Sequence, residues 1–397
     1  MQDVDELSLN RLQQFSYRCD KEQGVLRDVT DRVVPEETSP LACVGVALLA
    51  ALAATALCCV GRGGAAGATL DGAVLPAGVL SAVIVLLMVH VAAAAFADSV
   101  AQRTTGSGAT AVFVLARHSL RAVTLGLLLT ALCYGCALPP GVAPVVVLAA
   151  QAALYAVHWA HHLTGRFRAA RLLSPTGLVV LLALALVVAH SQTSAAPAAA
   201  AAAHATLAQV VLGAVAGGAA LVVAVQALCV AYGRARPRPC TAPAQYLVPA
   251  ALHAALGLLW YALDPRAFAA APFFYLQTYT WLFAAALLRL VVADMLALAP
   301  PRCGWPQAAL AACCVATRLC PGDTRLVAAA AAAALSFAAF AYSFYVTVAA
   351  VHDYLMRNPN TPLALPFDDE SNSSNNSSEQ PQPQQQPQQE QEQPAAC

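Results

Sequence analysis

Charged residues are scarce in this sequence, and its middle has almost none. The chain has 397 residues, of which 11% are charged, whereas soluble domains carry about 25%. Lys21 is the only lysine, and no glutamate occurs between Glu37 and Glu370. The stretch 41–351 contains five acidic residues: Asp71, Asp98, Asp264, Asp294 and Asp323. Such a stretch cannot present a charged surface to water, but it can present an apolar surface to lipid.

Recognisable catalytic and nucleotide-binding motifs are also missing. The sequence contains no P-loop, dinucleotide fingerprint, zinc-protease helix or nucleophile elbow, so we expect neither an enzyme nor a cofactor. The formal net charge is zero, which gives no indication of nucleic acid as a partner, and we expect none. The first forty residues hold nine acids and five bases. They lack an apolar core, so the first apolar segment should serve as both signal and anchor.

Long apolar runs are what the sequence has in abundance, and 59% of its residues are hydrophobic. A helix needs about 20 apolar residues to cross the hydrocarbon core of a bilayer. The runs are continuous, unlike the alternating strands of a barrel. We therefore predict an all-α, polytopic integral membrane bundle of about ten spanning helices. The expected spans are Leu41–Val60, Gly72–Ala97, Arg121–Leu138, Val142–Ala160, Leu173–Ala189, Leu207–Tyr232, Tyr246–Leu263, Phe268–Leu288, Trp305–Cys320 and Leu326–Val351.

The weakest of these segments is Trp305–Cys320, whose apolar run is short and contains Arg318 near its end. It crosses the membrane if Arg318 snorkels to the interface; otherwise it is re-entrant or interfacial. Ten spans place both ends of the chain on one side of the membrane, and nine place them on opposite sides. Basic residues recur in alternate loops from the N-terminus onward, which predicts a cytoplasmic N-terminus under the positive-inside rule.

Two polar tails flank the predicted membrane domain, which covers residues 41–351. Residues 1–40 are expected to be cytoplasmic and to include a short surface helix. Residues 352–397 are rich in Asn, Ser, Gln and Pro, a composition that predicts disorder. All N-glycosylation sequons of the chain lie in this second tail, and they receive a glycan only if the tail is luminal. They begin at Asn372, Asn375 and Asn376.

Arg289 and Asp294 are the candidate charges within or beside the membrane. Their separation by five residues places them on different faces of a helix, so a direct pair is not expected. In the simplest interpretation, Arg289 ends a span at the cytoplasmic face and Asp294 lies in the interface just beyond it. Ion-coupled transport usually needs carboxylates in mid-membrane. Since these are almost absent, the sequence predicts no coupled transport of protons or sodium.

A histidine cluster ends another predicted span. His158 and His162 are four residues apart and share a helical face, as two metal ligands would, and His161 is beside them. No carboxylate or cysteine is near in the sequence and a basic loop follows, so an interfacial, lipid-facing or solvated role is favoured over a metal site. Cys133 and Cys136 have the spacing of a redox pair, but their apolar setting indicates packing.

The whole-chain pattern resembles the multi-pass envelope protein family of the alphaherpesviruses. The features that carry the resemblance are the short polar head Met1–Pro40, the Ala/Val/Leu-rich spans from Leu41 to Val351, the scarcity of membrane charges and a residue bias typical of a GC-rich genome. The resemblance implies a protein of the virion envelope or host membranes, without enzymatic activity, that modulates membrane fusion or glycoprotein traffic. It concerns architecture and assigns no role to any residue.

Two functional hypotheses follow. The first is this non-enzymatic envelope protein, with the lipid bilayer and other envelope membrane proteins as partners. The second is a small-solute transporter with ten helices, which should have a polar cluster mid-membrane in each half. The candidates for such a cluster are Gln151, Gln226 and Gln277, each without an evident partner. Gly213 and Gly217 form a small-xxx-small face suited to close helix packing under either hypothesis.

Overall fold

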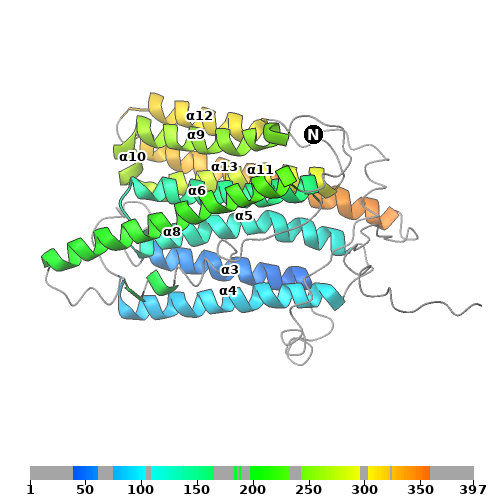
Figure 1. Ribbon diagram of the computed structural model, residues 1–397, viewed down its shortest axis with the longest axis horizontal. Coiled ribbons are helices and arrows are strands. Elements are labelled where there is room, and N and C mark those ends of the chain that lie inside the picture. Colours follow the sequence, from blue (N-terminus) through cyan, green and yellow to red (C-terminus); the bar gives the residue numbers. More distant parts are fainter. Residues whose placement is uncertain are drawn as a thin grey trace, which may run out of the picture.

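The computed structural model describes residues 39–60, 75–103, 109–136, 138–164, 183–185, 187–188, 197–232, 243–295, 303–321 and 324–357. Within these ranges the chain is helical and contains no strand. The helices lie side by side along the long axis of the molecule (Figure 1). They are α3 (Pro40–Val60), α4 (Ala77–Arg103), α5 (Ala109–Gly135), α6 (Val142–Thr164), α8 (Pro197–Tyr232), the 3₁₀ helix η4 (Pro243–Leu247), α9 (Val248–Leu263), α10 (Pro265–Ala270), α11 (Pro272–Met295), α12 (Trp305–Leu319) and α13 (Thr324–Arg357).

Eight helices of the described part are long and apolar enough to cross a membrane: α3, α4, α5, α6, α8, α9, α11 and α13. The predicted fold class, an all-α polytopic membrane bundle, is therefore confirmed. Of the two other predicted spans, Leu173–Ala189 lies largely outside the described residues, and Trp305–Cys320 forms α12, a helix of 15 residues. Most of both tails, including Asn372, Asn375 and Asn376, also lies outside the described residues.

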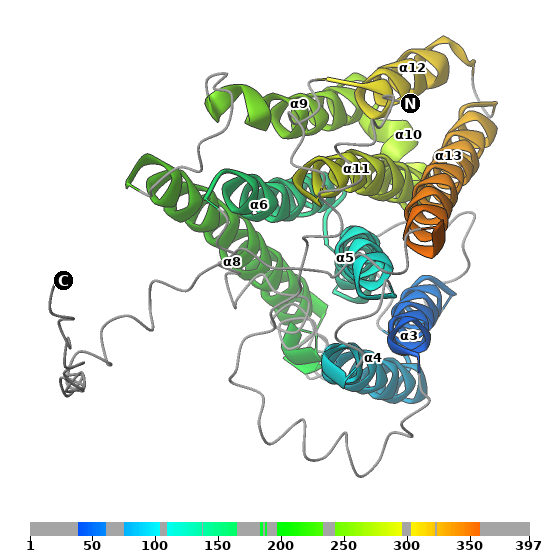
Figure 2. The ribbon, with the colours of Figure 1, turned by 90° about the vertical axis from the view of Figure 1, so that its right-hand side faces the viewer.

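Three helices, α5, α6 and α11, form the centre of the bundle. Figure 2 shows them surrounded by α3, α4, α8, α9, α12 and α13. Buried residues make up 78%, 72% and 83% of the spans in α5, α6 and α11, against 28%, 22% and 28% in α4, α8 and α13. The outer helices expose apolar side chains, which suits contact with lipid. Polar chemistry that needs shelter from lipid therefore has to lie among the three central helices.

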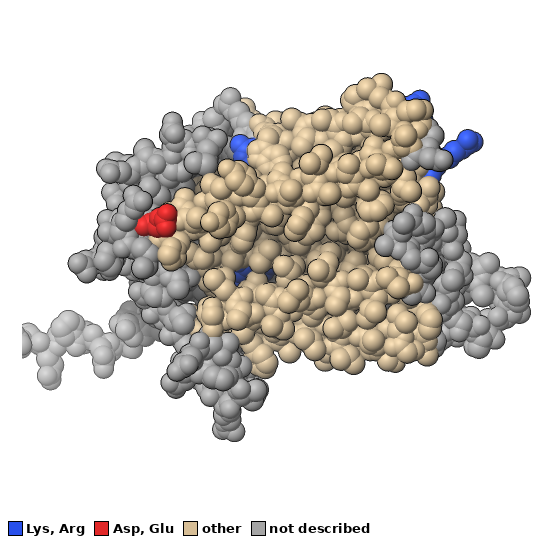
Figure 3. All heavy atoms as spheres, turned by 180° about the vertical axis from the view of Figure 1, so that it is seen from behind, with Lys and Arg blue, Asp and Glu red and all other residues tan. Residues whose placement is uncertain are grey.

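Charged side chains are rare on the described surface. Figure 3 shows one face of the molecule, on which uncharged residues cover nearly all of the described area. The coloured Lys, Arg, Asp and Glu side chains show mainly toward the two ends of that face, with one small recessed patch between them. Such an uncharged belt between two ends with charge is the arrangement that a hydrocarbon core requires.

The short helix α12 connects the two ends of the bundle. At its start, Gly304 lies against the guanidinium of Arg289, near the end of α11. At its end, the Cys320 carbonyl accepts a hydrogen bond from Arg325, which also pairs with Asp264 between α9 and α10. Figure 1 accordingly shows α12 beside α9 and along the bundle axis. This orientation favours a crossing segment over an interfacial one.

The two ends of the described membrane domain lie on the same side. In Figure 1 the start of α3 (blue) and the end of α13 (orange) are both toward the right-hand end of the bundle. An even number of crossings between Pro40 and Arg357 has this result. The arrangement supports the ten-span alternative over the nine-span alternative.

Several helices extend beyond the predicted bounds, among them α4, α6 and α11 at their C-terminal ends and α5, α8 and α13. The predicted start of α5 at Arg121 was wrong, because the helix begins at Ala109 and includes the half-buried Arg117. The prediction took a charged residue as the end of a span. The end of a helix that is packed between other helices can, however, include charged residues. α8 begins at Pro197, since proline suits the first helical turn and the alanines that follow are strong helix formers. α13 continues to Arg357, six residues into the predicted tail 352–397.

The prediction for the cysteine motif agrees with the structure, and the prediction for the glycine motif does not. Cys133 and Cys136 are buried among core side chains and form no disulfide with each other, as the packing interpretation predicts. The predicted close packing of Gly213 and Gly217 is wrong for the described residues, since a Cβ added at either would meet nothing within 4 Å. α8 packs on α6 through another part of its surface, around Ala219.

Candidate functional site

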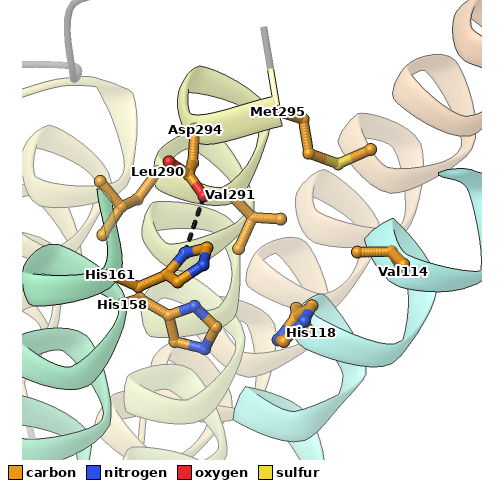
Figure 4. A pocket seen from close by; sticks show the side chains of 8 residues that line it. All are labelled: Val114, His118, His158, His161, Leu290, Val291, Asp294 and Met295. Atoms are coloured by element: carbon orange, nitrogen blue, oxygen red, sulfur yellow. Dashed lines mark ion pairs between the residues drawn. The ribbon is translucent and has the colours of Figure 1, made fainter. Parts of the chain in front are cut away.

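The ends of α5, α6 and α11 bring four ionisable side chains together. Figure 4 shows His118 from α5, His158 and His161 from α6, and Asp294 from α11 around one pocket. The remaining lining residues are apolar. The hollow between them has a volume of about 20 Å³, which is enough for one water molecule.

Asp294 is held between two imidazoles. Its Oδ2 lies 2.8 Å from Nδ1 of His161, and its Oδ1 lies 3.2 Å from Nδ1 of His162. The Asp294 side chain is 11% exposed, and those of His161 and His162 are 23% and 1% exposed. Adjacent residues leave a helix about 100° apart, so the two rings approach the carboxylate from different directions. A carboxylate withdrawn from water needs such partners, and here each oxygen has its own.

Two ring contacts hold the histidines from their other sides. The His118 and His158 rings meet edge to face, with centroids 5.0 Å apart and an interplanar angle of 89°. His162 meets Tyr246 of η4 in the same way, with centroids 6.2 Å apart. The cluster therefore joins four elements: α5, α6, α11 and η4.

The sequence-based interpretation of these residues was wrong in two respects. His158 and His162 are buried, whereas an interfacial, lipid-facing or solvated role was expected. A carboxylate does lie beside the histidines, because packing brings Asp294, 132 positions from His162 and one residue before the end of α11, next to them. The signal that could have found the pair is topological. Both segments end spans that the alternation of basic loops assigns to the same membrane face.

Arg289, the other predicted charge, contacts a different part of the bundle. Its guanidinium lies against Gly304 at the start of α12 and near the phenol of Tyr155 on α6. Arg289 and Asp294 both belong to α11, but they contact different residues. The candidate site is consequently centred on Asp294 and the imidazoles.

The chemistry available to this cluster is proton binding. Among the described residues, no three His, Cys, Asp or Glu side chains converge as metal ligands would. An imidazole whose Nδ1 faces a carboxylate is fixed in one orientation, and imidazoles and carboxylates inside membranes are the usual groups of proton relays. Asp294 and His161 can therefore hold or pass a proton where the bundle meets the aqueous phase.

Several other buried polar side chains join helices to one another. Gln277, which seemed to lack a partner, donates from Nε2 to Oγ1 of Thr130 at 3.2 Å. The Tyr279 hydroxyl donates to the Gly257 carbonyl at 2.9 Å. Hydrogen bonds of this kind between membrane helices stabilise a bundle by about 1 kcal/mol each. These side chains hold the central helix α11 to α5 and α9.

A second ion pair marks the opposite end of the bundle. Asp264 follows α9, caps α10 by accepting a hydrogen bond from the Ala267 amide at 3.1 Å, and lies 2.8 Å from Nη1 of Arg325. The short α10 and the start of α11 at Pro272 replace the single predicted span Phe268–Leu288. Since a guanidinium stays charged in proteins, this pair is structural.

No protein-family model matches the chain, and no curated protein shows significant similarity to it.

Proposed function

We propose that the chain is a non-enzymatic multi-pass membrane protein of the alphaherpesvirus envelope type that modulates membrane fusion or glycoprotein traffic. One observation supports this most: the outer helices α4, α8 and α13 present long apolar faces, with 28%, 22% and 28% of their spans buried. Such faces contact lipid and the spans of neighbouring membrane proteins. The whole-chain resemblance supplies the envelope as the setting.

The face of α8 is the best-suited contact surface for another span. Gly213 and Gly217 lie on it with no atom within 4 Å of an added Cβ. Small residues at this spacing let a second helix approach closely, and close approach drives association in lipid. The proposed partner is the transmembrane helix of an envelope glycoprotein.

Co-expression with envelope fusion glycoproteins tests this proposal. Content mixing between cells and the surface amount of each glycoprotein are measured with the full chain and with an unrelated multi-span protein at equal expression. We expect the full chain alone to change fusion or surface amount. The double variant Gly213→Leu/Gly217→Leu should reach the membrane and lose much of the effect. If neither quantity differs from the unrelated control, the proposed function is wrong.

The buried Asp294 cluster favours a second function, small-solute transport coupled to protons. The sequence argued against coupling because carboxylates in mid-membrane are almost absent. Asp294, however, is buried with two imidazoles at 2.8 and 3.2 Å. Carboxylate–imidazole groups within membrane spans are typical of proton-coupled carriers.

Reconstitution in liposomes with an imposed proton gradient tests the second function. Gradient-driven uptake of a small solute that is lost in Asp294→Asn and kept in Asp264→Asn would establish it. The second variant is the matched control, because Asp264 lies at the opposite end of the bundle. Absence of any gradient-dependent uptake across a panel of amino acids, sugars and nucleosides would exclude it.

A further inference from the structure

One face of α6 carries polar side chains from the middle of the bundle to its end. Gln151, Tyr155, His158 and His162 follow one another at intervals of four, three and four residues, which is the spacing of one helical face. Their exposures are 1%, 1%, 5% and 1%. Inward faces of membrane helices are usually apolar or small. We name these four residues the α6 seam.

At its outer end the α6 seam meets the Asp294 cluster. His162 contacts Asp294 directly, and His158 lines the hollow of about 20 Å³ together with His161 and His118. Figure 4 shows His158 one turn deeper than His161 on α6, facing the same pocket. A place for one water molecule therefore lies where the seam begins.

At its inner end the α6 seam meets polar atoms without hydrogen bonds. Neither the amide nitrogen nor the amide oxygen of Gln151 has a partner among the described residues, and the same holds for both ring nitrogens of His253 on α9. The two side chains are 1% and 2% exposed. The Tyr279 backbone lies close to the His253 ring. Neither ring nitrogen makes a hydrogen bond to it, however.

The contacts between α6 and α9 set their relative direction. A Cβ added at Gly257 would lie 2.8 Å from Cδ1 of Leu148. Further along α6, His162 meets Tyr246, which precedes α9 in the chain, at 6.2 Å between ring centroids. Residue numbers therefore rise on α6 as they fall on α9, and the two helices are antiparallel.

This direction places Gln151 and His253 at the same level. Gln151 is three residues beyond Leu148 and His253 is four residues before Gly257, which moves them about 4.5 Å and 6 Å in the same direction along the axis. The His253 ring also contacts Phe283 of α11, with centroids 5.8 Å apart. Both unsatisfied side chains thus face the space between α6, α9 and α11.

Toward the opposite end of the bundle an aromatic cluster closes the core. Trp260 packs on Tyr275 with centroids 4.5 Å apart, and Phe268 packs on Tyr275 at 5.3 Å. All three are at most 1% exposed. Among the described residues of α6, the polar side chains that lead from Gln151 to an end of the helix run toward Asp294.

We propose that water enters the bundle along the α6 seam from the Asp294 cluster and hydrates Gln151 and His253, forming a half-pathway that ends at mid-bundle. In hydrocarbon no solvent satisfies unpaired polar groups, so four such atoms at one level require a ligand that both donates and accepts hydrogen bonds. Water fits that requirement and the size of the hollow at the entrance. The inference stands apart from both proposed functions.

Cysteine accessibility in the full-length, membrane-embedded protein tests the half-pathway. Gln151→Cys and the control Ala153→Cys are treated with aminoethyl methanethiosulfonate, and adducts above those of the wild-type chain are counted by intact mass. Ala153 lies at nearly the same depth of α6 and is equally buried, but it packs against α8. We expect about tenfold faster labelling of Gln151→Cys, because the reagent reacts with the thiolate and a thiol ionises poorly in apolar surroundings.

A second pair keeps the test decisive if Gln151→Cys fails to reach the membrane. His253→Cys should react. Ala251→Cys, on the exposed face of α9, should not react, because the lipid around it excludes the water in which a thiol ionises. Labelling of Gln151→Cys and His253→Cys at the rates of their controls would overturn the proposal. Gln151 and His253 would then be satisfied by bonding to each other in a dry core.

Discussion

The centre of this bundle (α5, α6 and α11) and its rim of outer helices differ in where they place polar side chains. Among the central helices, the carboxylate of Asp294 is shared by His161 and His162, and Gln277 binds Thr130. The outer helices α4, α8 and α13 bury less than a third of their spans, and these spans carry almost no charge. Although the chain has few charges, it therefore still contains buried ionisable and hydrogen-bonding side chains. It keeps ionisable side chains where another helix supplies the partner, which is the condition for burying them.

The largest expected effect comes from breaking the contact between two central helices. A Cβ at Gly126 of α5 would overlap the side chain of Thr280 on α11. Gly126→Leu should lower the free energy of unfolding by about 3 kcal/mol, because a core without free space has to shift its helices. The rim control is Gly217→Leu, where a Cβ meets nothing within 4 Å. Thermal unfolding in detergent measures both, and equal losses would show that centre and rim do not differ.

A smaller loss is expected at the Asp294 cluster. Asp294→Ala removes the acceptor of two imidazoles, one of them 1% exposed, and should cost about 2 kcal/mol of stability. Asp294→Asn keeps an acceptor oxygen and a similar shape, so it should cost less. The same unfolding assay compares the two variants. A loss in Asp294→Ala no greater than in Asp294→Asn would mean that the carboxylate is not used as the geometry indicates.

The ion pair at the other end of the bundle should matter less. Arg325 is 29% exposed where it meets Asp264, and partly solvated pairs contribute about 1 kcal/mol or less. Arg325→Gln should therefore shift the unfolding midpoint only slightly and leave α12 in place. Limited proteolysis between α12 and α13 is the second measurement. Rapid cleavage there would show that this pair, and not helix packing, holds α12 against α9.

The smallest expected effect is none at all, and it concerns the sidedness of the tails. Since α3 begins and α13 ends at the same end of the bundle, a cytoplasmic N-terminus places the C-terminal tail in the cytoplasm. The sequons at Asn372, Asn375 and Asn376 should then remain unglycosylated. Gel mobility with and without a glycan-removing enzyme, together with an epitope tag at the N-terminus that antibody cannot reach in intact cells, checks this. A mobility shift abolished by replacing the three asparagines would require an odd number of spans.

The spans were predictable because their cause is local. Crossing hydrocarbon needs an unbroken apolar run, and such a run is visible in the chain without knowledge of its neighbours. The predicted bounds of α3 and α9 lie within a few residues of the observed ones. The start of α5 was missed by twelve residues because Arg117 and Arg121 were taken to end a span. Whether a charge ends a helix or is sheltered by another helix depends on contacts that a local pattern does not contain.

The site was not predictable for the same reason. Asp294 and the imidazoles come from different helices, and only their packing places a carboxylate beside rings 132 residues away in sequence. Gln277 likewise found its partner, Thr130, on another helix. The residue types were noticed, but their burial was not, because burial is a property of the whole bundle. The closing of the core by Trp260 and its neighbours is equally a result of tertiary packing.

The length of α12 has a consequence for the bilayer around it. With 15 residues, α12 is about 22 Å long, several ångströms less than an average hydrocarbon core of about 30 Å. Its neighbour α9 continues directly from η4 and the two give a span of 19 residues, whereas α8 on another side of the bundle has 36 residues. A protein with one short segment imposes hydrophobic mismatch unevenly, and thinner lipid beside α12 or snorkelling of Arg318 to the interface accommodates it.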